Sequence, residues 1–327
     1  MPRPKVFVAR QIPEAGLAMI RAECDAVIWP HPLPPSHEQL REATADCDGL
    51  VSLLTDRIDE ALLKACPKLK VVSNFAVGFN NVDVPACSAR GIAVGNTPDV
   101  LTESTADIAV TLLLAAARRL PECTLDAKEG RWKTWEPLGW LGQDLVGRTL
   151  GIVGMGRIGY ATAKRLHRGW DMKVLYTARS PKLDADRELA ATRVELNELL
   201  RRSDFVSVHA DLNASTQKLF GAEQFQMMKP TAVFVNTSRG PLVDQAALAD
   251  ALRRKVIFAA GLDVTDPEPL PPSHELYSLS NCIIAPHVAS ATIDTRDAVA
   301  RMCAENLLAG VFGRALPNCV NRGELPK

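Results

Sequence analysis

The chain has 327 residues, which is more than one hydrophobic core usually serves, so two domains are expected. Apolar residues make up 47%, charged residues 23%, and the formal net charge is zero, a balance that argues against a nucleic-acid partner. The N-terminus lacks the apolar stretch of a secretory signal, and no apolar run is long enough to cross a bilayer. We therefore expect a cytoplasmic protein with no membrane contact.

Cysteine and histidine are scattered along the chain. The eight cysteines include no C-x-x-C pair, and the six histidines include no H-E-x-x-H cluster. In a chain without a signal sequence this pattern favours reduced thiols over disulfides, and it predicts no catalytic metal.

Short apolar runs alternate with helical patterns through the first hundred residues, which is typical of a parallel α/β sheet. The predicted strands lie at residues 5–9, 26–29, 49–54, 70–75 and 91–94. The loop at residues 75–81 follows the fourth strand, so it lies at a carboxyl end, where open sheets bind ligands.

A long helix is predicted next, from Ala106 to Leu120, capped by Thr102–Thr105 and ended by Pro121. It is apolar on most faces, so we expect it to be buried between domains or against another subunit. Residues 131–141 follow, and they hold three of the five tryptophans with little pattern of helix or strand. Exposed aromatic side chains are costly in water, so this arm is expected to dock onto a partner subunit.

A second alternating series begins at residue 149. Six strands are predicted, the count of a complete Rossmann domain, at residues 150–153, 173–176, 205–209, 232–236, 258–263 and 282–285. The segment 291–312 reads as one amphipathic helix that could return to the first domain.

The first strand of this series opens into Gly154-Met155-Gly156-Arg157-Ile158-Gly159, followed by a helical pattern. Strand, glycine turn and helix are the context in which G-x-G-x-x-G indicates a dinucleotide site. Gly154 permits the tight turn, Gly156 lets the backbone approach the pyrophosphate, and Gly159 lets helix and strand pack closely. The alternative is an ordinary glycine-rich turn.

After the second strand of a Rossmann domain, an acidic residue normally binds the adenosine ribose. Here the strand end reads Tyr176-Thr177-Ala178-Arg179-Ser180, with no acid. Arg179 offers a fork of donors suited to a 2′-phosphate, and Ser180 offers another. This pattern favours NADP(H) over NAD(H), unless Arg179 is simply a solvated surface residue.

Three polar residues follow three successive strands: Arg239, Glu268 and His287. Because the ends of parallel strands meet at one sheet edge, the three could converge. Reduction of a 2-keto acid needs a cation to hold the carboxylate, which an arginine supplies. It also needs an acid for the emerging alkoxide, which a histidine oriented by a carboxylate supplies.

These residues belong to an ordered set of motifs: Ala76-Val77-Gly78, the glycine turn, Asn236-Thr237-Ser238-Arg239-Gly240, Gly261-Leu262-Asp263-Val264 with Pro267-Glu268-Pro269, and Pro286-His287. In this set the chain resembles the D-isomer-specific 2-hydroxyacid dehydrogenases over essentially its full length. Thr97–Thr102, Trp132–Leu138 and Leu175–Arg179 are most similar to the glyoxylate/hydroxypyruvate reductases of that family.

The resemblance implies two doubly wound α/β domains. Residues 1–101 and 288–327 would form a flavodoxin-like substrate-binding domain, and the inserted residues 102–287 a Rossmann domain that binds NADP(H) preferentially, with NAD(H) possible. It also implies a homodimer, joined through the Rossmann domains and the 131–141 arm. Which of Trp135 and Trp140 would reach the neighbouring active site stays open.

The resemblance further assigns site residues. Arg239 would anchor the substrate carboxylate, His287 would be the general acid and Glu268 its partner, with Val77 and Gly78 contributing backbone N–H groups to the substrate. Asp263 would contact the nicotinamide carboxamide. The remaining cofactor-binding residues would be Thr105, Gly154, Gly156, Arg157, Ile158, Gly159, Arg179, Ser180, Thr237 and Ser290.

Two alternatives remain. Another dehydrogenase of the family, such as phosphoglycerate dehydrogenase, is disfavoured because no regulatory domain follows and the ribose-binding acid is missing. An NAD(H)-sensing transcriptional corepressor shares the fold. It would be expected to show disordered tails, whereas the elements predicted here run from near the first residue to near the last, so this alternative is disfavoured.

Overall fold

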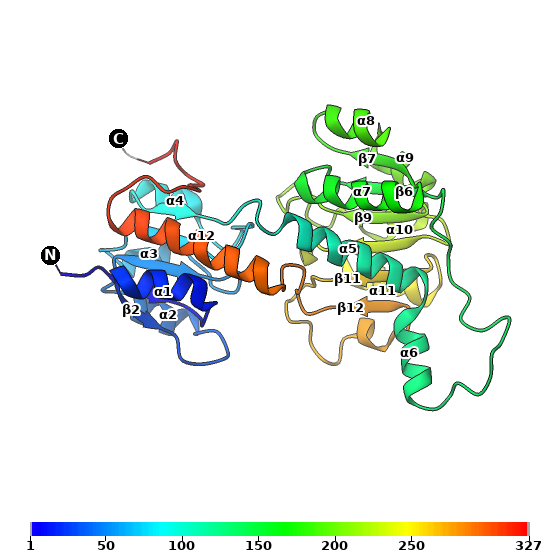
Figure 1. The fold of residues 1–327 in the computed structure, drawn as a ribbon, viewed down its shortest axis with the longest axis horizontal. Helices are drawn as coiled ribbons and strands as arrows, with labels where there is room; N and C mark the ends of the chain where they lie inside the picture. The colour runs from blue at the N-terminus through cyan, green and yellow to red at the C-terminus, as the bar shows by residue number, and fades with distance from the viewer. Residues whose placement is uncertain (1, 326–327) are drawn as a thin grey trace. The chain divides into compact units, whose positions relative to one another are not determined.

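The computed structural model describes residues 2–325, which divide into two compact units (Figure 1). Of the described residues, unit 1 comprises 2–101 and 291–325, and unit 2 comprises 102–290. The expected pair of parallel α/β domains, one with its chain interrupted by the other, is confirmed.

Unit 1 contains a five-stranded parallel sheet in the order β2-β1-β3-β4-β5, which is the flavodoxin-like strand order. Its strands are β1 (Lys5–Val8), β2 (Asp25–Ile28), β3 (Gly49–Ser52), β4 (Val71–Asn74) and β5 (Ala93–Gly95). Its helices are α1 (Glu14–Glu23), α2 (His37–Thr44), α3 (Glu60–Ala65), α4 (Val84–Ala89) and α12 (Ile293–Val311). Helices α1 and α12 cover one face of the sheet, and α2, α3 and α4 cover the other.

Unit 2 contains a seven-stranded parallel sheet in the order β12-β11-β10-β9-β6-β7-β8. Its strands are β6 (Thr149–Val153), β7 (Lys173–Thr177), β8 (Thr192–Arg193), β9 (Phe205–Val208), β10 (Val233–Asn236), β11 (Ala259–Leu262) and β12 (Cys282–Ile284). Its α-helices are α5 (Thr102–Ala117), α6 (Leu120–Lys128), α7 (Arg157–Trp170), α8 (Leu183–Leu189), α9 (Leu196–Arg202), α10 (Ala222–Met227) and α11 (Gln245–Arg253). Two 3₁₀ turns complete the unit, η1 (Gly240–Leu242) and η2 (Glu275–Ser278).

Apart from its short edge strand β8, the seven-stranded sheet is covered on both faces. Helices α5, α7 and α8 pack on one face, and α9, α10 and α11 pack on the other. A sheet covered on both sides needs near-continuous apolar strands, which is why the strands could be located in the sequence. Their carboxyl ends form a single edge, and all the loops of the candidate site in this unit leave from it.

Two sequence predictions for unit 2 were wrong in detail. The predicted helix 106–120 is two helices: α5 begins four residues earlier, at Thr102, and ends at Ala117, and α6 then begins at Leu120. Arg119, in the left-handed conformation, separates them, and Pro121 lies in the first turn of α6 instead of ending a helix. The predicted six strands are seven, because β8 has only two exposed residues and leaves no apolar run.

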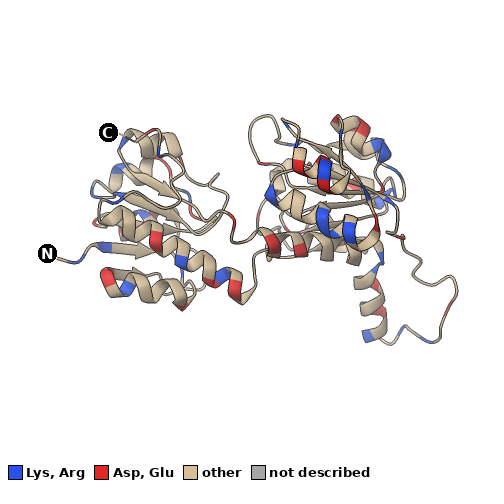
Figure 2. Ribbon diagram, turned by 45° about the horizontal axis from the view of Figure 1, so that its top comes forward, with Lys and Arg blue, Asp and Glu red and all other residues tan. Residues whose placement is uncertain are grey.

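Charged side chains of both signs lie on the helices of each unit, and several of them form ion pairs (Figure 2). On α7, for example, Arg165 pairs with Glu103 and Asp107 of α5 at 2.7 Å each. Within residues 2–325 no helix is long and apolar enough to span a membrane. All eight cysteines are free thiols.

The packing of α1 against α12 gives a first prediction. A Cβ atom added at Gly16 of α1 would overlap the backbone carbonyl of Ala300 on α12. We therefore expect Gly16→Ala to lower the free energy of unfolding by about 1–3 kcal/mol, because neither helix backbone can move without loss of contacts. Thermal unfolding measures the effect. Gly323→Ala is the matched control, since its Cβ would meet nothing within 4 Å, and an equal loss in both variants would contradict the prediction.

Candidate active site

The glycine turn joins β6 to α7, as predicted. Gly154 has φ +99°, and a Cβ atom there would lie 2.6 Å from the backbone nitrogen of Ala210. Gly156 faces open space and is the N-cap of α7, with no side chain capping the helix. The start of α7 is thus uncapped and open, which is the arrangement in which helix N-termini bind phosphate groups. Gly159 packs against the carbonyl of Gly154, as the close packing of helix and strand requires.

The residues expected at the adenosine end lie just after β7. Arg179 and Ser180 are both exposed. Arg193 on β8, which the sequence did not single out, donates to the carbonyls of Ala178 and Arg179 at 3.0 and 3.3 Å. Two guanidinium groups therefore belong to this strand end, and the acid that would repel a phosphate is absent from it.

The remaining residues predicted for the cofactor lie in the same unit. Arg157 and Ile158 begin α7, and Thr105 is buried in the first turns of α5. Thr237 is buried after β10, and its hydroxyl has no hydrogen-bond partner among the described residues. Ser290 is partly buried at the end of the unit. Their contacts with a cofactor stay predictions.

Arg239 is held by the loop after β10. The buried Asn236 side chain accepts the N–H of Ser238 at 3.0 Å and donates to the carbonyl of Arg239 at 2.9 Å. The Ser238 hydroxyl donates to the carbonyl of Ala210, in the loop after β9, at 2.5 Å. This short loop is therefore fixed at both ends, and it leaves the guanidinium of Arg239 partly buried.

The loop after β11 carries Glu268 and packs directly on the Arg239 loop. Gly240 makes this possible, since a Cβ atom there would overlap the carbonyl of Thr265. The Gln245 side chain, at the start of α11, donates to the carbonyl of Asp266 and braces the same contact. Within the loop, the Thr265 hydroxyl donates to the carbonyl of Pro267 at 2.9 Å.

His287 completes the group after β12. Its Nδ1 lies 2.5 Å from Oε1 of Glu268, so the carboxylate orients the ring and leaves Nε2 as the nitrogen available to a ligand. His287 has φ +53°, a conformation that is unfavourable for a residue with a Cβ atom. Its N–H donates to the carbonyl of Asp263 at 3.0 Å, which helps to hold the backbone there.

The carboxylate of Asp263 lies inside the fold. It accepts the N–H groups of Val288 and Ala289 at 2.8 and 2.9 Å, so both oxygens bind the segment directly after His287. Burial raises the pKa of the Asp263 carboxyl, while these N–H groups and the charge of His287 act in the opposite direction. The expected contact of Asp263 with a nicotinamide stays a prediction. These bonds keep residues 288–290 in unit 2, and the chain crosses to unit 1 after Ser290.

The charges of Arg239, Glu268 and His287 stabilise the ionised forms of their neighbours in this group. Burial lowers the pKa of the Arg239 guanidinium, and the nearby carboxylates of Glu268 and Asp211 counteract this effect. Burial raises the pKa of Glu268, but the hydrogen bond and charge of His287, the N–H of Thr265 and the charge of Arg239 together lower it below its usual range. The structure thus brings Arg239, Glu268 and His287 together at one sheet edge.

In unit 1 the loop after β4 presents unused backbone donors. The side chain of Asn96 donates to the carbonyl of Val77, and that of Asn74 donates to the carbonyl of Gly78, both at 2.8 Å. Among the described residues no hydrogen bond uses the N–H groups of Val77 and Gly78. Two asparagines that sequence reasoning missed therefore hold this loop through its carbonyls and leave the two N–H groups unused.

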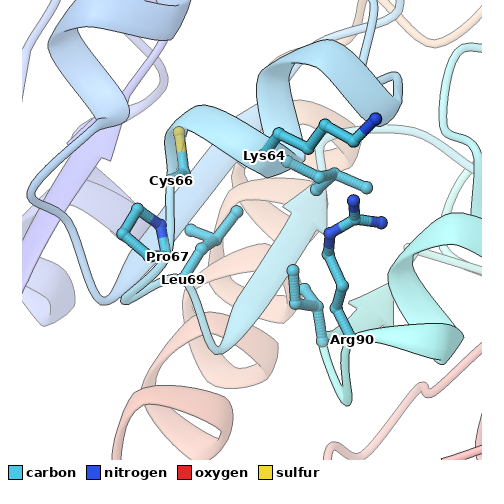
Figure 3. Close-up of a pocket in the computed structure, with 7 residues that line it drawn as sticks. Lys64, Cys66, Pro67, Leu69 and Arg90 are labelled. Carbon is cyan, nitrogen blue, oxygen red and sulfur yellow. The ribbon is translucent and has the colours of Figure 1, made fainter.

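A pocket of about 380 Å³ lies at the opposite, amino end of β4 and β5 (Figure 3). Apolar side chains line it together with Lys64 and Arg90, which both pair with Glu60, at 3.1 and 3.6 Å. It lies away from the strand ends that carry the site residues. Within residues 2–325 no group of three or more His, Cys, Asp or Glu side chains could hold a metal ion.

Comparison with known proteins gives one consistent result. A family model described as the NAD-binding domain of D-isomer specific 2-hydroxyacid dehydrogenase matches residues 110–289. A glyoxylate reductase of Korarchaeum cryptofilum is 50% identical over 321 residues, covering 98% of this chain and 96% of the relative. A glyoxylate reductase of Thermococcus litoralis is 45% identical over 327 residues, covering 99% and 98%.

Solved structures agree. A protein of Thermus thermophilus matches with a TM-score of 0.90 and 44% identity, over 97% of this chain and 99% of that one. An NADPH-dependent glyoxylate/hydroxypyruvate reductase of Sinorhizobium meliloti, in complex with NADP and malonate, matches with a TM-score of 0.85 and 34% identity, over 99% of each chain. With this identity along its whole length, the chain belongs to the D-isomer-specific 2-hydroxyacid dehydrogenase family of NAD(P)-dependent oxidoreductases.

Proposed function

We propose that the protein is an NADPH-preferring reductase that transfers hydride to a small 2-keto acid, glyoxylate or hydroxypyruvate, and forms the D-2-hydroxy acid. The observation that carries the proposal is the contact of His287 with Glu268 beside Arg239 at one sheet edge. The names of the relatives from Korarchaeum and Thermococcus support glyoxylate as substrate. Unit 2 would bind the dinucleotide and unit 1 would contribute to substrate binding.

The dinucleotide would supply the hydride when bound. Arg239 would hold the substrate carboxylate through paired N–H donors and polarise the adjacent carbonyl. In unit 1, the N–H groups of Val77 and Gly78 would be available as donors to an anionic group of a substrate. His287, oriented through Nδ1 by Glu268, would deliver the proton from Nε2 to the oxygen that gains negative charge.

Initial rates with glyoxylate, hydroxypyruvate and pyruvate, each with NADPH and with NADH, test the proposal as a whole. We expect turnover of glyoxylate or hydroxypyruvate with a clear preference for NADPH. Preference for NADH would overturn the cofactor assignment. No turnover with any pair would overturn the reductase assignment and favour a nucleotide-sensing corepressor of the same fold.

The roles of Arg239 and His287 predict different kinetic defects. Arg239→Ala should raise KM for the keto acid strongly, because the carboxylate loses its cation. His287→Ala should mainly lower kcat, by about 10²–10⁴-fold, the usual contribution of a positioned acid or base. Steady-state kinetics at matched pH measure both effects. Arg201→Ala, an exposed position on α9, is the control, and unchanged kinetics in both site variants would contradict the assignment.

Arg179 is proposed to bind the 2′-phosphate of NADPH, with Ser180 beside it. Arg179→Ala should raise KM for NADPH about tenfold, as expected for the loss of a charge-assisted hydrogen bond, and leave KM for NADH nearly unchanged. The ratio of kcat/KM for the two cofactors is the readout. Arg187→Ala on α8 is a nearby control with an exposed guanidinium. An equal loss for both cofactors would show that Arg179 acts on the fold and not on the phosphate.

We also propose a homodimer that uses the 131–141 arm. The arm has no helix or strand, and Trp135 and Leu138 are 79% and 81% exposed in the single chain. Trp140 instead donates to Asp126 of α6 at 2.9 Å, so Trp135 is the better candidate to reach the neighbouring subunit.

Light scattering coupled to size exclusion tests the dimer. We expect a mass of two chains for the wild type and of one chain for the double variant Trp135→Ser, Leu138→Ser, because these side chains lose their apolar contact area. Leu183→Ser, at a similarly exposed leucine on α8, is the control and should stay dimeric. A monomeric wild type would refute the assembly.

A further inference from the structure

His209 follows β9 and has no role in the proposed mechanism. In the sheet β9 lies beside β6, and the connections leave these two strands in opposite directions, through β7 and β8 on one side and β10 to β12 on the other. Open parallel sheets bind ligands beyond the carboxyl ends of the strands at such a reversal point. His209 therefore lies at the position in unit 2 where a parallel sheet of this strand order is expected to bind a ligand.

The backbone at His209 is fixed between two loops of the candidate site. A Cβ atom at Gly154 would lie 2.6 Å from the carbonyl carbon of His209 and from the nitrogen of Ala210. On the other side, Ser238 donates to the carbonyl of Ala210. His209 is thus held between the glycine turn and the loop that carries Arg239.

The ring of His209 is partly buried, and its Nε2 lies 2.9 Å from the hydroxyl of Ser207. Burial lowers the pKa of His209 to about 3, so the ring is neutral near pH 7. Ser207 is fully buried, and among the described residues its hydroxyl has no other hydrogen-bond partner. If Nε2 carried the proton, the hydroxyl hydrogen would be buried without an acceptor, which is costly. Ser207 therefore donates to Nε2, and the proton of the ring lies on Nδ1.

Nδ1 has no hydrogen-bond partner among residues 2–325. It is also not among the fully buried side-chain atoms that lack a partner, so a ligand can reach it. We infer that His209 is a cofactor-binding residue, whose neutral Nδ1–H donates to an oxygen of the ribose–phosphate unit on the nicotinamide side of the dinucleotide. This inference rests on the proposed function. Because NADPH and NADH are identical in that half, His209 would serve both, unlike Arg179.

Calorimetric titration of the protein with NADPH and with NADH, in the absence of substrate, tests the inference. His209→Ala should raise both dissociation constants about three- to tenfold, the effect of one lost hydrogen bond. His209→Asn should restore binding to within about twofold, because the amide nitrogen of asparagine can take the place of Nδ1. Ser207→Ala should weaken binding less than His209→Ala, since the ring keeps its N–H but no longer has a fixed tautomer.

Melting temperatures of the three variants separate binding from folding. Dissociation constants equal to wild type in His209→Ala, with or without a lower melting temperature, would overturn the inference and leave the proposed function standing. A defect confined to NADPH would also overturn it, since the contact would then involve the 2′-phosphate. A wild type that binds neither dinucleotide would overturn the proposed function and this inference with it.

Discussion

The buried residue Asp263 ties together the strand ends on which the candidate site depends. Its N–H donates to the carbonyl of Asn236 at the end of β10, and its own carbonyl accepts the N–H of His287 after β12. Its carboxylate then binds the N–H groups of Val288 and Ala289. One residue at the end of β11 thus connects three successive strand ends. A buried carboxylate is costly unless its oxygens are paired, and here backbone donors pair both.

This arrangement explains how His287 can keep a left-handed backbone. The conformation costs about 1–2 kcal/mol for a residue with a Cβ atom. Three hydrogen bonds to Asp263, from the N–H groups of His287 and the two residues after it, hold the backbone there. Strain of this kind persists where the surrounding structure over-determines the backbone, as it does at many functional sites. Here the constraint orients the ring toward Glu268, so the tautomer and direction of the imidazole are set before any ligand arrives.

The loops at this edge are braced against one another by small or polar residues. Gly240 allows backbone contact with Thr265, and Ser238 bonds the loop after β9. In unit 1, Asn74 and Asn96 do the same for the loop after β4. Such bracing limits the rearrangement that a charged ligand would require, and a preorganised set of donors and charges is what electrostatic stabilisation of a reaction needs.

Much of this protein could be predicted from its sequence. Eleven of the twelve strands leave apolar runs because both faces of each sheet are covered. The glycine turn and the strand-end residues Arg239, Glu268 and His287 could be found because a parallel sheet places all carboxyl ends on one edge. The strand β8 and the break between α5 and α6 left no such signal. Two residues form no apolar run, and the residue type of Arg119 does not reveal its left-handed conformation.

What only the tertiary structure decided is which partner each polar group has. The periodicity of the sequence does not reveal that Asp263 binds residues 25 and 26 positions later, or that Ser207 contacts Nε2 of His209. Local sequence determines secondary structure because helix and strand periods repeat along the chain. Hydrogen bonds between loops depend instead on the strand order and on how the loops pack, which only the assembled sheet defines.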